Sequence, residues 1–264
     1  MTLILDIGNS DVVAGLYAND TWLHLARTPS YPAQSTAFYQ ANLRLWLLEA
    51  NLTLSQVRSA TISSVVPDLT GPVGQAVGEL FALEPTLIDA SLYARLPITV
   101  LRPNEIGTDL VANALAAFLR YQKACIVVDF GTALTFTAIS AAGVMRGVAI
   151  APGLKTAIRS LFANTAQLPQ VPLEVPDSAL GQDTVHAIQA GVMLGYEGLV
   201  RSMLARIRAE LGTSDCAVVA TGGLANALPA LQDEFTETLP RLTLDGIRLL
   251  GEFALPSSKA GGKR

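Results

Sequence analysis

The stretch LILDIGNS at residues 3–10 has a counterpart, IVVDFGTA, at residues 126–133. In both stretches an apolar run ends in an aspartate, which is followed two residues later by a glycine and then by a small polar residue. A segment of alternating residues comes next, at 12–17 in the first case and at 134–139 in the second. Each pattern predicts a strand, a tight turn and a second strand. The same local structure is therefore predicted twice in one chain.

The remainder of each half also follows one pattern, a third strand and then alternating helices and strands. In the first half we expect strands at 22–25, 60–66 and 86–89 and helices at 35–50 and 69–82. In the second half we expect strands at 147–150 and 217–220 and helices at 154–165, 184–210 and from about 224, with a helix at 110–121 joining the halves. This is the ribonuclease-H-like pattern, so we predict a duplicated α/β fold with lobes at 1–115 and 116–264 and a nucleotide cleft between them.

The composition argues against several classes of protein. The chain has 264 residues, of which 50% are hydrophobic and 15% charged, and its formal net charge is −4. Basic residues gather only at 259–264, so we expect no nucleic-acid partner. The uncharged segment 130–145 is too short to span a membrane, and the N-terminus lacks the basic start of a signal peptide. Cys125 and Cys216 lie in apolar runs, as buried thiols of a reducing compartment do. These features favour a cytoplasmic protein with small-molecule partners.

The two aspartate turns are the strongest candidates for function. Glycine beside a carboxylate lets backbone N–H groups approach a phosphate, and the carboxylate can hold Mg²⁺ directly or through water. One such turn, at Asp6 or at Asp129, would be an ordinary hairpin. Two copies in the same topological place favour a site that clamps the polyphosphate of ATP, as phosphoryl transfer requires.

Three further loops have both a functional and a plain interpretation. Gly107-Thr108-Asp109 lies where a loop becomes a helix, so it could bind an anion, but on the residues alone a helix cap is the simpler interpretation. Asp109 could serve as a general base only if an acceptor hydroxyl lies within reach. Gly153 and Gly222 follow strands and would let a ligand approach the backbone, or would simply separate elements.

An ordered set of motifs resembles the type III pantothenate kinases. The motifs are DIGNS at 6–10, SSVVP at 63–67, PNEIGTD at 103–109, DFGTALT at 129–135, IAPGL at 150–154, LGQDT at 180–184 and ATGGLA at 220–225. The family belongs to the actin, Hsp70 and sugar-kinase superfamily, so the resemblance implies an actin-like ATPase fold. It also implies ATP-dependent phosphorylation of pantothenate to 4′-phosphopantothenate, the first step of coenzyme A biosynthesis. A homodimer, Mg²⁺ and a monovalent cation, K⁺ or NH₄⁺, are implied as well.

The resemblance also assigns roles to individual residues. The first phosphate loop would consist of Asp6, Ile7, Gly8, Asn9, Ser10, Asp11, Val12 and Val13, with Asp6 also holding Mg²⁺ through the phosphate. Asp129 would bind the monovalent cation, Thr132 an ATP phosphate, and Gly222 and Gly223 would lie near the nucleotide base. The pantothenate pocket would be lined by Gly107, Thr108, Asp109 as the catalytic base, Leu110, and Thr184 from the dimer partner.

The sequence departs from the family pattern mainly on the acceptor side. Leu110 stands where the family usually has an arginine, and Val100 where it tends to have a tyrosine. Loss of a bidentate contact to a carboxylate costs on the order of 1.5–3 kcal/mol, which corresponds to a roughly ten- to hundredfold weaker affinity. Arg102 could substitute. Two alternatives follow: a weak or inactive relative with a binding or regulatory role, and a kinase for another small hydroxyl acceptor.

Overall fold

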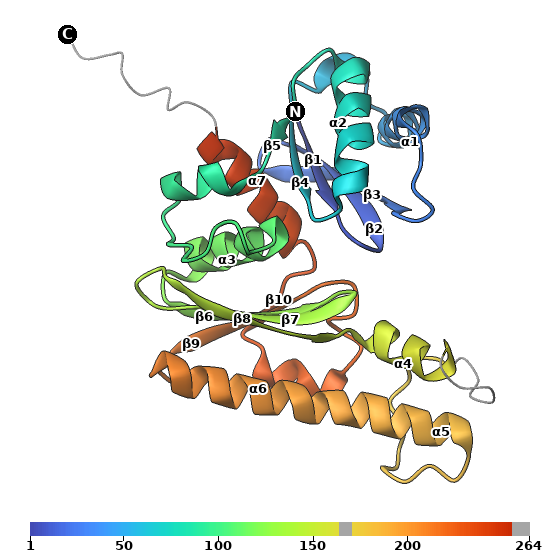
Figure 1. Cartoon of the computed structure of the whole chain (residues 1–264), viewed down its shortest axis with the longest axis vertical. Helices are drawn as coiled ribbons and strands as arrows, with labels where there is room; N and C mark the ends of the chain where they lie inside the picture. Colours follow the sequence, from blue (N-terminus) through green and yellow to red (C-terminus); the bar gives the residue numbers. More distant parts are fainter. Residues whose placement is uncertain (164–170, 255–264) are drawn as a thin grey trace. The chain divides into compact units, whose positions relative to one another are not determined.

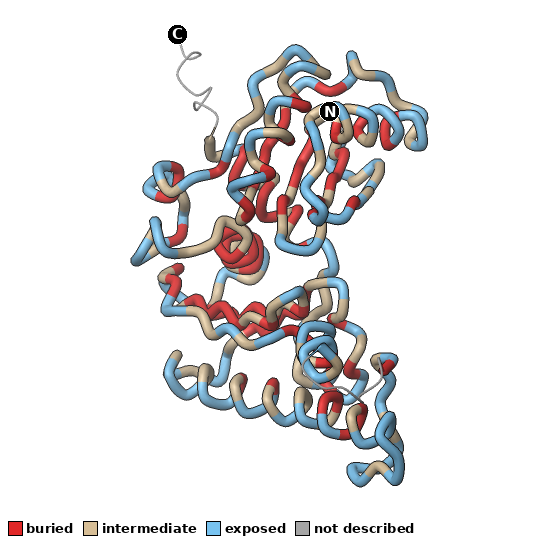
Figure 2. The backbone as a smooth tube through the Cα atoms, turned by 45° about the vertical axis from the view of Figure 1, so that its right-hand side comes forward, coloured by how far each residue is buried: buried red, intermediate tan, exposed pale blue. Residues whose placement is uncertain are grey.

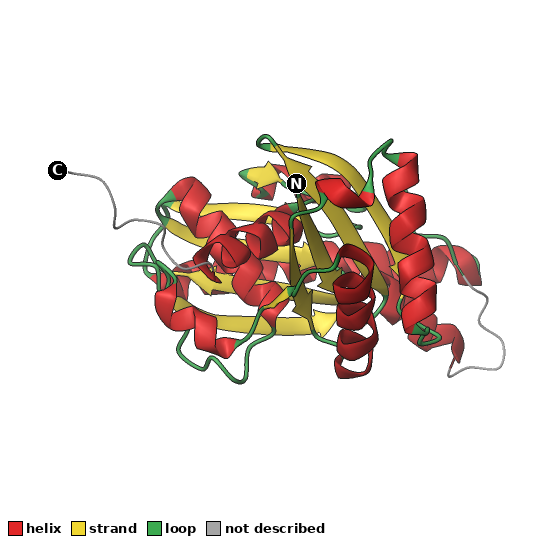
Figure 3. Ribbon diagram, turned by 90° about the horizontal axis from the view of Figure 1, so that it is seen from above, coloured by secondary structure: helices red, strands yellow, loops and turns green. Residues whose placement is uncertain are grey.

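The structure is a computed structural model that describes residues 1–163 and 171–254. The chain divides into two compact units, one formed by Met1–Ala116 with the segment from Thr243 onward, the other by Ala117–Leu242. Each unit contains one five-stranded sheet with helices packed against it (Figures 1 and 3). The predicted α/β class is confirmed.

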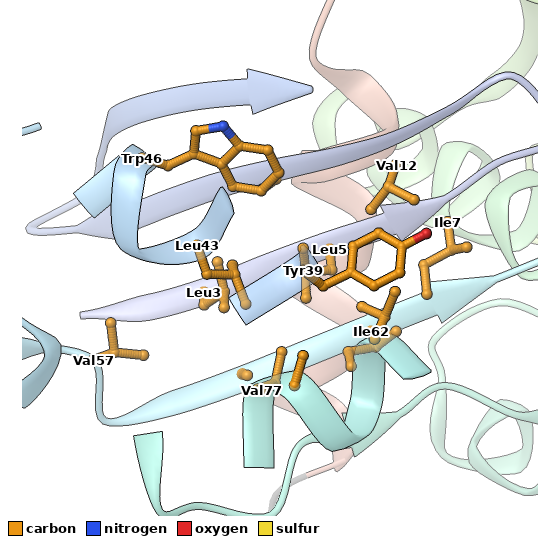
Figure 4. Close-up of a cluster of buried hydrophobic side chains, with 14 of the residues drawn as sticks. Leu3, Leu5, Ile7, Val12, Tyr39, Leu43, Trp46, Val57, Ile62 and Val77 are labelled. Atoms are coloured by element: carbon orange, nitrogen blue, oxygen red, sulfur yellow. The ribbon is translucent and has the colours of Figure 1, made fainter. Parts of the chain in front are cut away.

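The first unit begins with three antiparallel strands, β1 (Thr2–Ile7), β2 (Asp11–Ala18) and β3 (Thr21–Pro29). They are followed by α1 (Thr36–Glu49), a 3₁₀ turn (Leu54–Gln56), β4 (Ser59–Ser64), α2 (Pro67–Phe81), β5 (Thr86–Leu87) and the 3₁₀ helix η2 (Ala90–Arg95). The strand order is β3-β2-β1-β4-β5, with β4 parallel to β1 and β5 parallel to β4. Apolar side chains of β1 and β4 meet those of α1 and α2 in the core, where Tyr39 lies with its hydroxyl toward Ile7 and Val12 (Figure 4).

The second unit repeats this arrangement. Its strands β6 (Ala124–Phe130), β7 (Ala133–Ile139) and β8 (Met145–Pro152) are antiparallel. Then come α4 (Leu154–Ala163), α5 (Thr184–Gln189), a π-helical turn (Ala190–Leu194), α6 (Gly195–Leu211), β9 (Cys216–Thr221), the 3₁₀ helix η4 (Pro229–Glu234) and β10 (Glu237–Thr238). The order β10-β9-β6-β7-β8, with β9 parallel to β6 and β10 parallel to β9, has the topology of the first sheet. The predicted duplication of a ribonuclease-H-like fold is therefore confirmed.

The high hydrophobic content is explained by the central strands. Six of the seven residues of β6 are buried, and buried residues follow the strands of both sheets (Figure 2). Strands covered on both faces read as continuous apolar runs. In the described part of the chain no helix combines the length and the apolar character needed to cross a membrane.

The predicted lobe boundary at residue 116 needs a correction at the C-terminal end. Helix α3 (Thr108–Tyr121) contains the boundary, but α7 (Leu242–Ala254) belongs almost entirely to the first unit. The indole of Trp22 on β3 donates a 2.8 Å hydrogen bond to Asp245 Oδ1. Gly246 touches α3 so closely that an added Cβ would lie 2.1 Å from the carbonyl oxygen of Ala112. Through these long-range contacts α7 packs within the first unit. No local sequence pattern reveals them.

Four other expectations differ from the described structure or lie partly or wholly outside it. The helix expected from about 224 is wrong: turns follow Gly222, and the next helical segment is η4, which begins at Pro229. The long helix expected at 184–210 is interrupted by the π-helical turn. Residues 164 and 165 of the helix expected at 154–165, and the basic cluster at 259–264, lie outside the described residues.

Candidate active site

The first aspartate turn lies at the end of β1, in the first unit. Asp6 pairs with Val13 of β2 on one side and with Ser63 of β4 on the other. The turn is closed by a 3.0 Å hydrogen bond from the N–H of Gly8 to the carbonyl of Asp11. Asn9 at its tip is exposed. The predicted strand, turn and second strand are thus confirmed, and the tip is accessible to a ligand.

The side chains of this loop differ in what they can reach. Ile7 and Val12 are 0% and 1% exposed, so they can act on a phosphate only through their backbone. The Asp11 carboxylate, an additional negative charge in the loop, has Arg27 Nη1 3.8 Å from its Oδ2. Both side chains are in contact with solvent, so this ion pair contributes little to stability. It does bring a cation beside the loop.

The GTD motif adjoins the same turn through the end of β4. Ser63, which is fully buried, lies with its hydroxyl oxygen 2.7 Å from that of Thr108, the first residue of α3. Since Ser63 is the β4 partner of Asp6, this hydrogen bond fixes the beginning of α3 next to the first aspartate turn. The first unit therefore brings together Asp6, Thr108 and Asp109, which are about 100 residues apart in sequence.

Asp109 is held in the first turn of α3 with a perturbed carboxyl group. Its Oδ1 accepts a 2.8 Å hydrogen bond from the N–H of Leu110, the next residue of the helix, which occupies one of its two oxygens. Burial raises the pKa of Asp109 above its ordinary value, although the bond from Leu110 acts in the opposite direction. A Cβ at Gly107 would lie 2.5 Å from Asp109 Oδ1, so the absence of a side chain two residues earlier leaves room for the carboxylate. A partly desolvated carboxylate of this kind is typical of a general base.

Tyr93 of η2 interacts electrostatically with Asp109 and was not among the expected site residues. Its side chain is buried, and burial together with the negative charges of Asp109 and Asp89 raises the pKa of Tyr93 to about 12. The phenol therefore lies within electrostatic range of the Asp109 carboxylate. Sequence reasoning missed it because η2 is a short irregular helix without a recognisable motif.

The second aspartate turn, at the end of β6, meets the TGG motif inside the second unit. Asp129 pairs with Thr135 of β7 and with Thr221 of β9. Gly222 follows with φ +89°, and a Cβ on it would lie 2.4 Å from Asp129 Oδ1. Glycine is required here on both counts. The next residue, Gly223, has nothing within 4 Å of an added Cβ.

The IAPGL motif supports the same turn from the other side. The carbonyl of Thr132 accepts hydrogen bonds from the N–H of Gly153, at 3.0 Å, and from the hydroxyl of Thr156, at 2.7 Å. A Cβ on Gly153 would lie 2.2 Å from the carbonyl oxygen of Gly131. The structure thus joins three of the quoted motifs, DFGT, APG and TGG, at one end of the second sheet.

Thr221 is a polar residue of this cluster that stands in the ATGGLA motif but was not among the expected site residues. Its side chain is 0% exposed, and its hydroxyl has no hydrogen-bond partner among the described residues. Ser63 occupies the equivalent position in the first unit, as the parallel-strand partner of the aspartate, and its hydroxyl contacts Thr108. Because a buried hydroxyl normally has a hydrogen-bond partner, the Thr221 hydroxyl is able to contact a ligand bound beside Asp129.

Thr184 lies apart from these clusters, at the start of α5. Asp183 caps this helix: its Oδ1 accepts a 2.9 Å hydrogen bond from the N–H of His186, and this bond lowers the pKa of Asp183. Thr184 itself is exposed.

The comparisons with known proteins decide the family. The family model for type III pantothenate kinase matches residues 2–206. This chain belongs to the type III pantothenate kinase family. The family member of Treponema pallidum strain Nichols is 42% identical over 270 residues, with 98% of each chain covered. That of Roseiflexus sp. strain RS-1 is 40% identical, with 96% of this chain and 98% of the relative covered.

A solved structure agrees with the fold. The ethanolamine utilization protein EutJ from Carboxydothermus hydrogenoformans superposes with a TM-score of 0.55 at 17% identity, covering 94% of this chain and 89% of that one. At this identity the likeness concerns the fold alone. The recognition of the family from its motifs is confirmed by the family model and the relatives, and so is the expectation of an enzyme.

Proposed function

We propose that this chain transfers the γ-phosphoryl group of ATP to pantothenate, giving 4′-phosphopantothenate and ADP, as the first step of coenzyme A biosynthesis. Membership of the type III pantothenate kinase family supports this activity. The observation that carries it is the junction in the first unit, where the hydrogen bond between Ser63 and Thr108 joins the phosphate turn of Asp6 to the carboxylate of Asp109. Phosphoryl transfer needs such a pairing of a phosphate cradle with a base for the acceptor hydroxyl.

In the proposed reaction Asp109 accepts the proton of the pantothenate hydroxyl as that oxygen attacks the γ-phosphorus. The bond between the γ-phosphorus and the bridging oxygen breaks, and ADP leaves. The raised pKa of Asp109 suits this role, because a base with a higher pKa gains more from taking the proton. Gly107, Thr108 and Leu110 line the acceptor side, while the loop of residues 6–13, Thr132, Gly222 and Gly223 bind ATP.

The donor atoms fit the cations that the family resemblance implies, Mg²⁺ and K⁺ or NH₄⁺. In the described part of the chain no three His, Cys, Asp or Glu side chains gather in a way that could hold a metal. Mg²⁺ is commonly held by one or two carboxylates together with substrate phosphates and water, so Asp6 suffices on the protein side. When bound, Mg²⁺ neutralises phosphate charge. For K⁺ or NH₄⁺, Asp129 supplies a carboxylate and Thr221 a buried hydroxyl that lacks a partner among the described residues.

The proposed state in solution is a homodimer in the cytoplasm, with Thr184 completing the pantothenate site of the partner. Beside the exposed Thr184, Leu180 is 84% exposed and Val185 37% exposed. An apolar surface at this place is what a subunit contact would cover. Sedimentation of the purified chain measures the state directly, and a monomer at micromolar concentration would contradict it.

A panel of acceptors tests the proposed activity. ADP release is measured with ATP, Mg²⁺ and K⁺ in the presence of pantothenate, of pantothenate amides that lack the carboxylate, and of no acceptor. We expect turnover with pantothenate. Turnover with the neutral amides alone would favour the alternative of a different hydroxyl acceptor. Absence of turnover with every acceptor would favour the inactive relative, for which neither the comparisons nor the site gives support.

Leu110→Arg examines the departure from the family pattern. Leu110 is 9% exposed in the first turn of α3, directly after the catalytic base. Arginine adds a fork that can bind the pantothenate carboxylate, so we expect the KM for pantothenate to fall by about tenfold. Leu110→Met keeps the volume without charge and should leave KM unchanged. Equal KM values in both variants would show that Leu110 does not limit acceptor binding.

Thr221→Val examines the cation site. The change removes the partnerless hydroxyl and keeps the side-chain shape, so we expect thermal stability to be retained or to rise slightly. The K⁺ concentration that gives half-maximal activity should rise several-fold. The K⁺ concentration that gives half of the K⁺-dependent increase in melting temperature, measured with ATP present, should rise by the same factor. Thr137→Val, in the same sheet and also buried, is the control that should not alter either value. An unchanged K⁺ response of Thr221→Val would exclude this residue from the cation site.

A further inference from the structure

Ser30 is a fully buried polar residue in the loop between β3 and α1, and no motif draws attention to it. Both of its donors bind the phosphate turn. Its N–H donates to the carbonyl of Ser10 at 2.9 Å, and its hydroxyl donates to the carbonyl of Gly8 at 2.5 Å. One side chain and its own backbone thus hold two carbonyl groups of a turn that lies about 20 residues earlier in sequence.

These two hydrogen bonds fix the orientation of two peptide groups. In a trans peptide the C=O and the following N–H point in opposite directions. Because the carbonyl of Gly8 points toward Ser30, the N–H of Asn9 points away from it. The carbonyl of Ser10 likewise points toward Ser30, so the N–H of Asp11 points away. Carbonyl oxygens would repel a phosphate, whereas N–H groups of a turn bind one.

We propose that Ser30 is a positioning residue for ATP: it holds the carbonyls of Gly8 and Ser10 away from the nucleotide and keeps the loop's N–H groups available to its phosphates. The inference rests on the proposed function only in identifying the anion as ATP. Ser30 has no competing duty as a helix cap, because α1 is capped by Ser35, whose hydroxyl accepts from the N–H of Phe38. Its hydroxyl therefore serves the turn.

Three substitutions of Ser30 distinguish a role in orienting the turn for ATP from a role in stabilising the fold alone. Ser30→Ala removes the hydroxyl, Ser30→Cys keeps the volume with a weak donor, and Ser30→Thr keeps the hydroxyl. Ser59→Ala is the matched control, since Ser59 bonds Thr2 at the opposite end of β1, with 2.9 Å between the two hydroxyl oxygens. For each variant, KM for ATP, KM for pantothenate, kcat and the melting temperature are measured, and Mg·ATP binding is measured by calorimetry without acceptor.

We expect Ser30→Ala and Ser30→Cys to raise the KM and Kd for ATP by about tenfold, the value of one buried hydrogen bond. The KM for pantothenate should stay within about twofold, because the acceptor pocket is untouched, and Ser30→Thr should restore ATP binding at least in part. Ser59→Ala should leave ATP binding unchanged. Equal rises in both KM values, insoluble Ala and Cys variants, or unchanged ATP binding in both would overturn the proposal. Since calorimetry needs no acceptor, failure of the pantothenate assay alone would count against the proposed function and leave this test valid.

Discussion

Asp109→Asn is expected to lower kcat by about 10²–10⁴-fold, the usual contribution of a general base. Asparagine has nearly the same shape, and its amide oxygen can still accept the hydrogen bond from the N–H of Leu110. It cannot take the proton of the acceptor hydroxyl. The KM for ATP should change little, because the phosphate turn is untouched. A kcat within about tenfold of the unsubstituted enzyme would remove Asp109 from the role of base.

The same substitution should not destabilise the protein at neutral pH. Because burial raises the pKa of Asp109 in the folded state, the fold favours the neutral carboxyl. Stability from this group is complete below the pKa of the unfolded chain and is lost as pH rises through the folded-state pKa. Asparagine avoids that loss, so its melting temperature at about pH 7.5 should equal or exceed that of the unsubstituted enzyme, with the difference shrinking toward about pH 4. For the unsubstituted enzyme, kcat should fall on the acid side at a pH above the ordinary range of an aspartate.

Gly222→Ala is expected to disable the second aspartate turn. Its φ of +89° would strain any other residue by about 1–3 kcal/mol. The added methyl would also lie 2.4 Å from Asp129 Oδ1 and 2.7 Å from the backbone carbon of Phe130, an overlap that costs roughly another 1–3 kcal/mol. Urea denaturation should therefore show a loss of a few kcal/mol, and ATP turnover at ordinary ATP concentrations should be lost.

Gly223→Ala provides the matched control. The neighbouring glycine has no atom within 4 Å of an added Cβ, and its φ lies outside the region that favours glycine. The unfolding free energy should therefore change by less than about 1 kcal/mol. If the two alanine variants lose the same unfolding free energy, the close approach of Gly222 to Asp129 does not matter for the fold.

Much of the fold could be predicted from the sequence because its information is local. The two aspartate turns and the strands around them follow from apolar runs that end in Asp and Gly. The membership of α7 in the first unit could not be predicted, because it depends on contacts such as that of Trp22 with Asp245, 223 residues apart. The wrongly expected helix at residue 224 has a similar cause: TGGLA resembles a helix start, but the turn after Gly222 is fixed by its packing on β6.

The candidate site shows the same division. Its carboxylates and glycines stand in motifs and were expected. The hydroxyl groups that organise them were not expected as site residues: Ser63 and Thr221 stand in quoted motifs without an assigned role, and Ser30 stands in none. Each lies beside a partner, Thr108, Asp129 and Gly8 respectively, that is distant in sequence. Serine and threonine are common in strands and loops, so their type alone gives no signal. Only their burial and their hydrogen-bond or strand partners in the structure reveal their role.

Phosphorylation of pantothenate with Asp109 as the base can be followed by mass spectrometry of the product. The purified chain is incubated with ATP, Mg²⁺, K⁺ and millimolar pantothenate, and the Asp109→Asn variant serves as the blank. We expect one 4′-phosphopantothenate for each ADP formed, at a rate roughly a hundred times that of the blank or more, since the blank lacks the general base. ADP without phosphopantothenate, or no product above the blank, would contradict it.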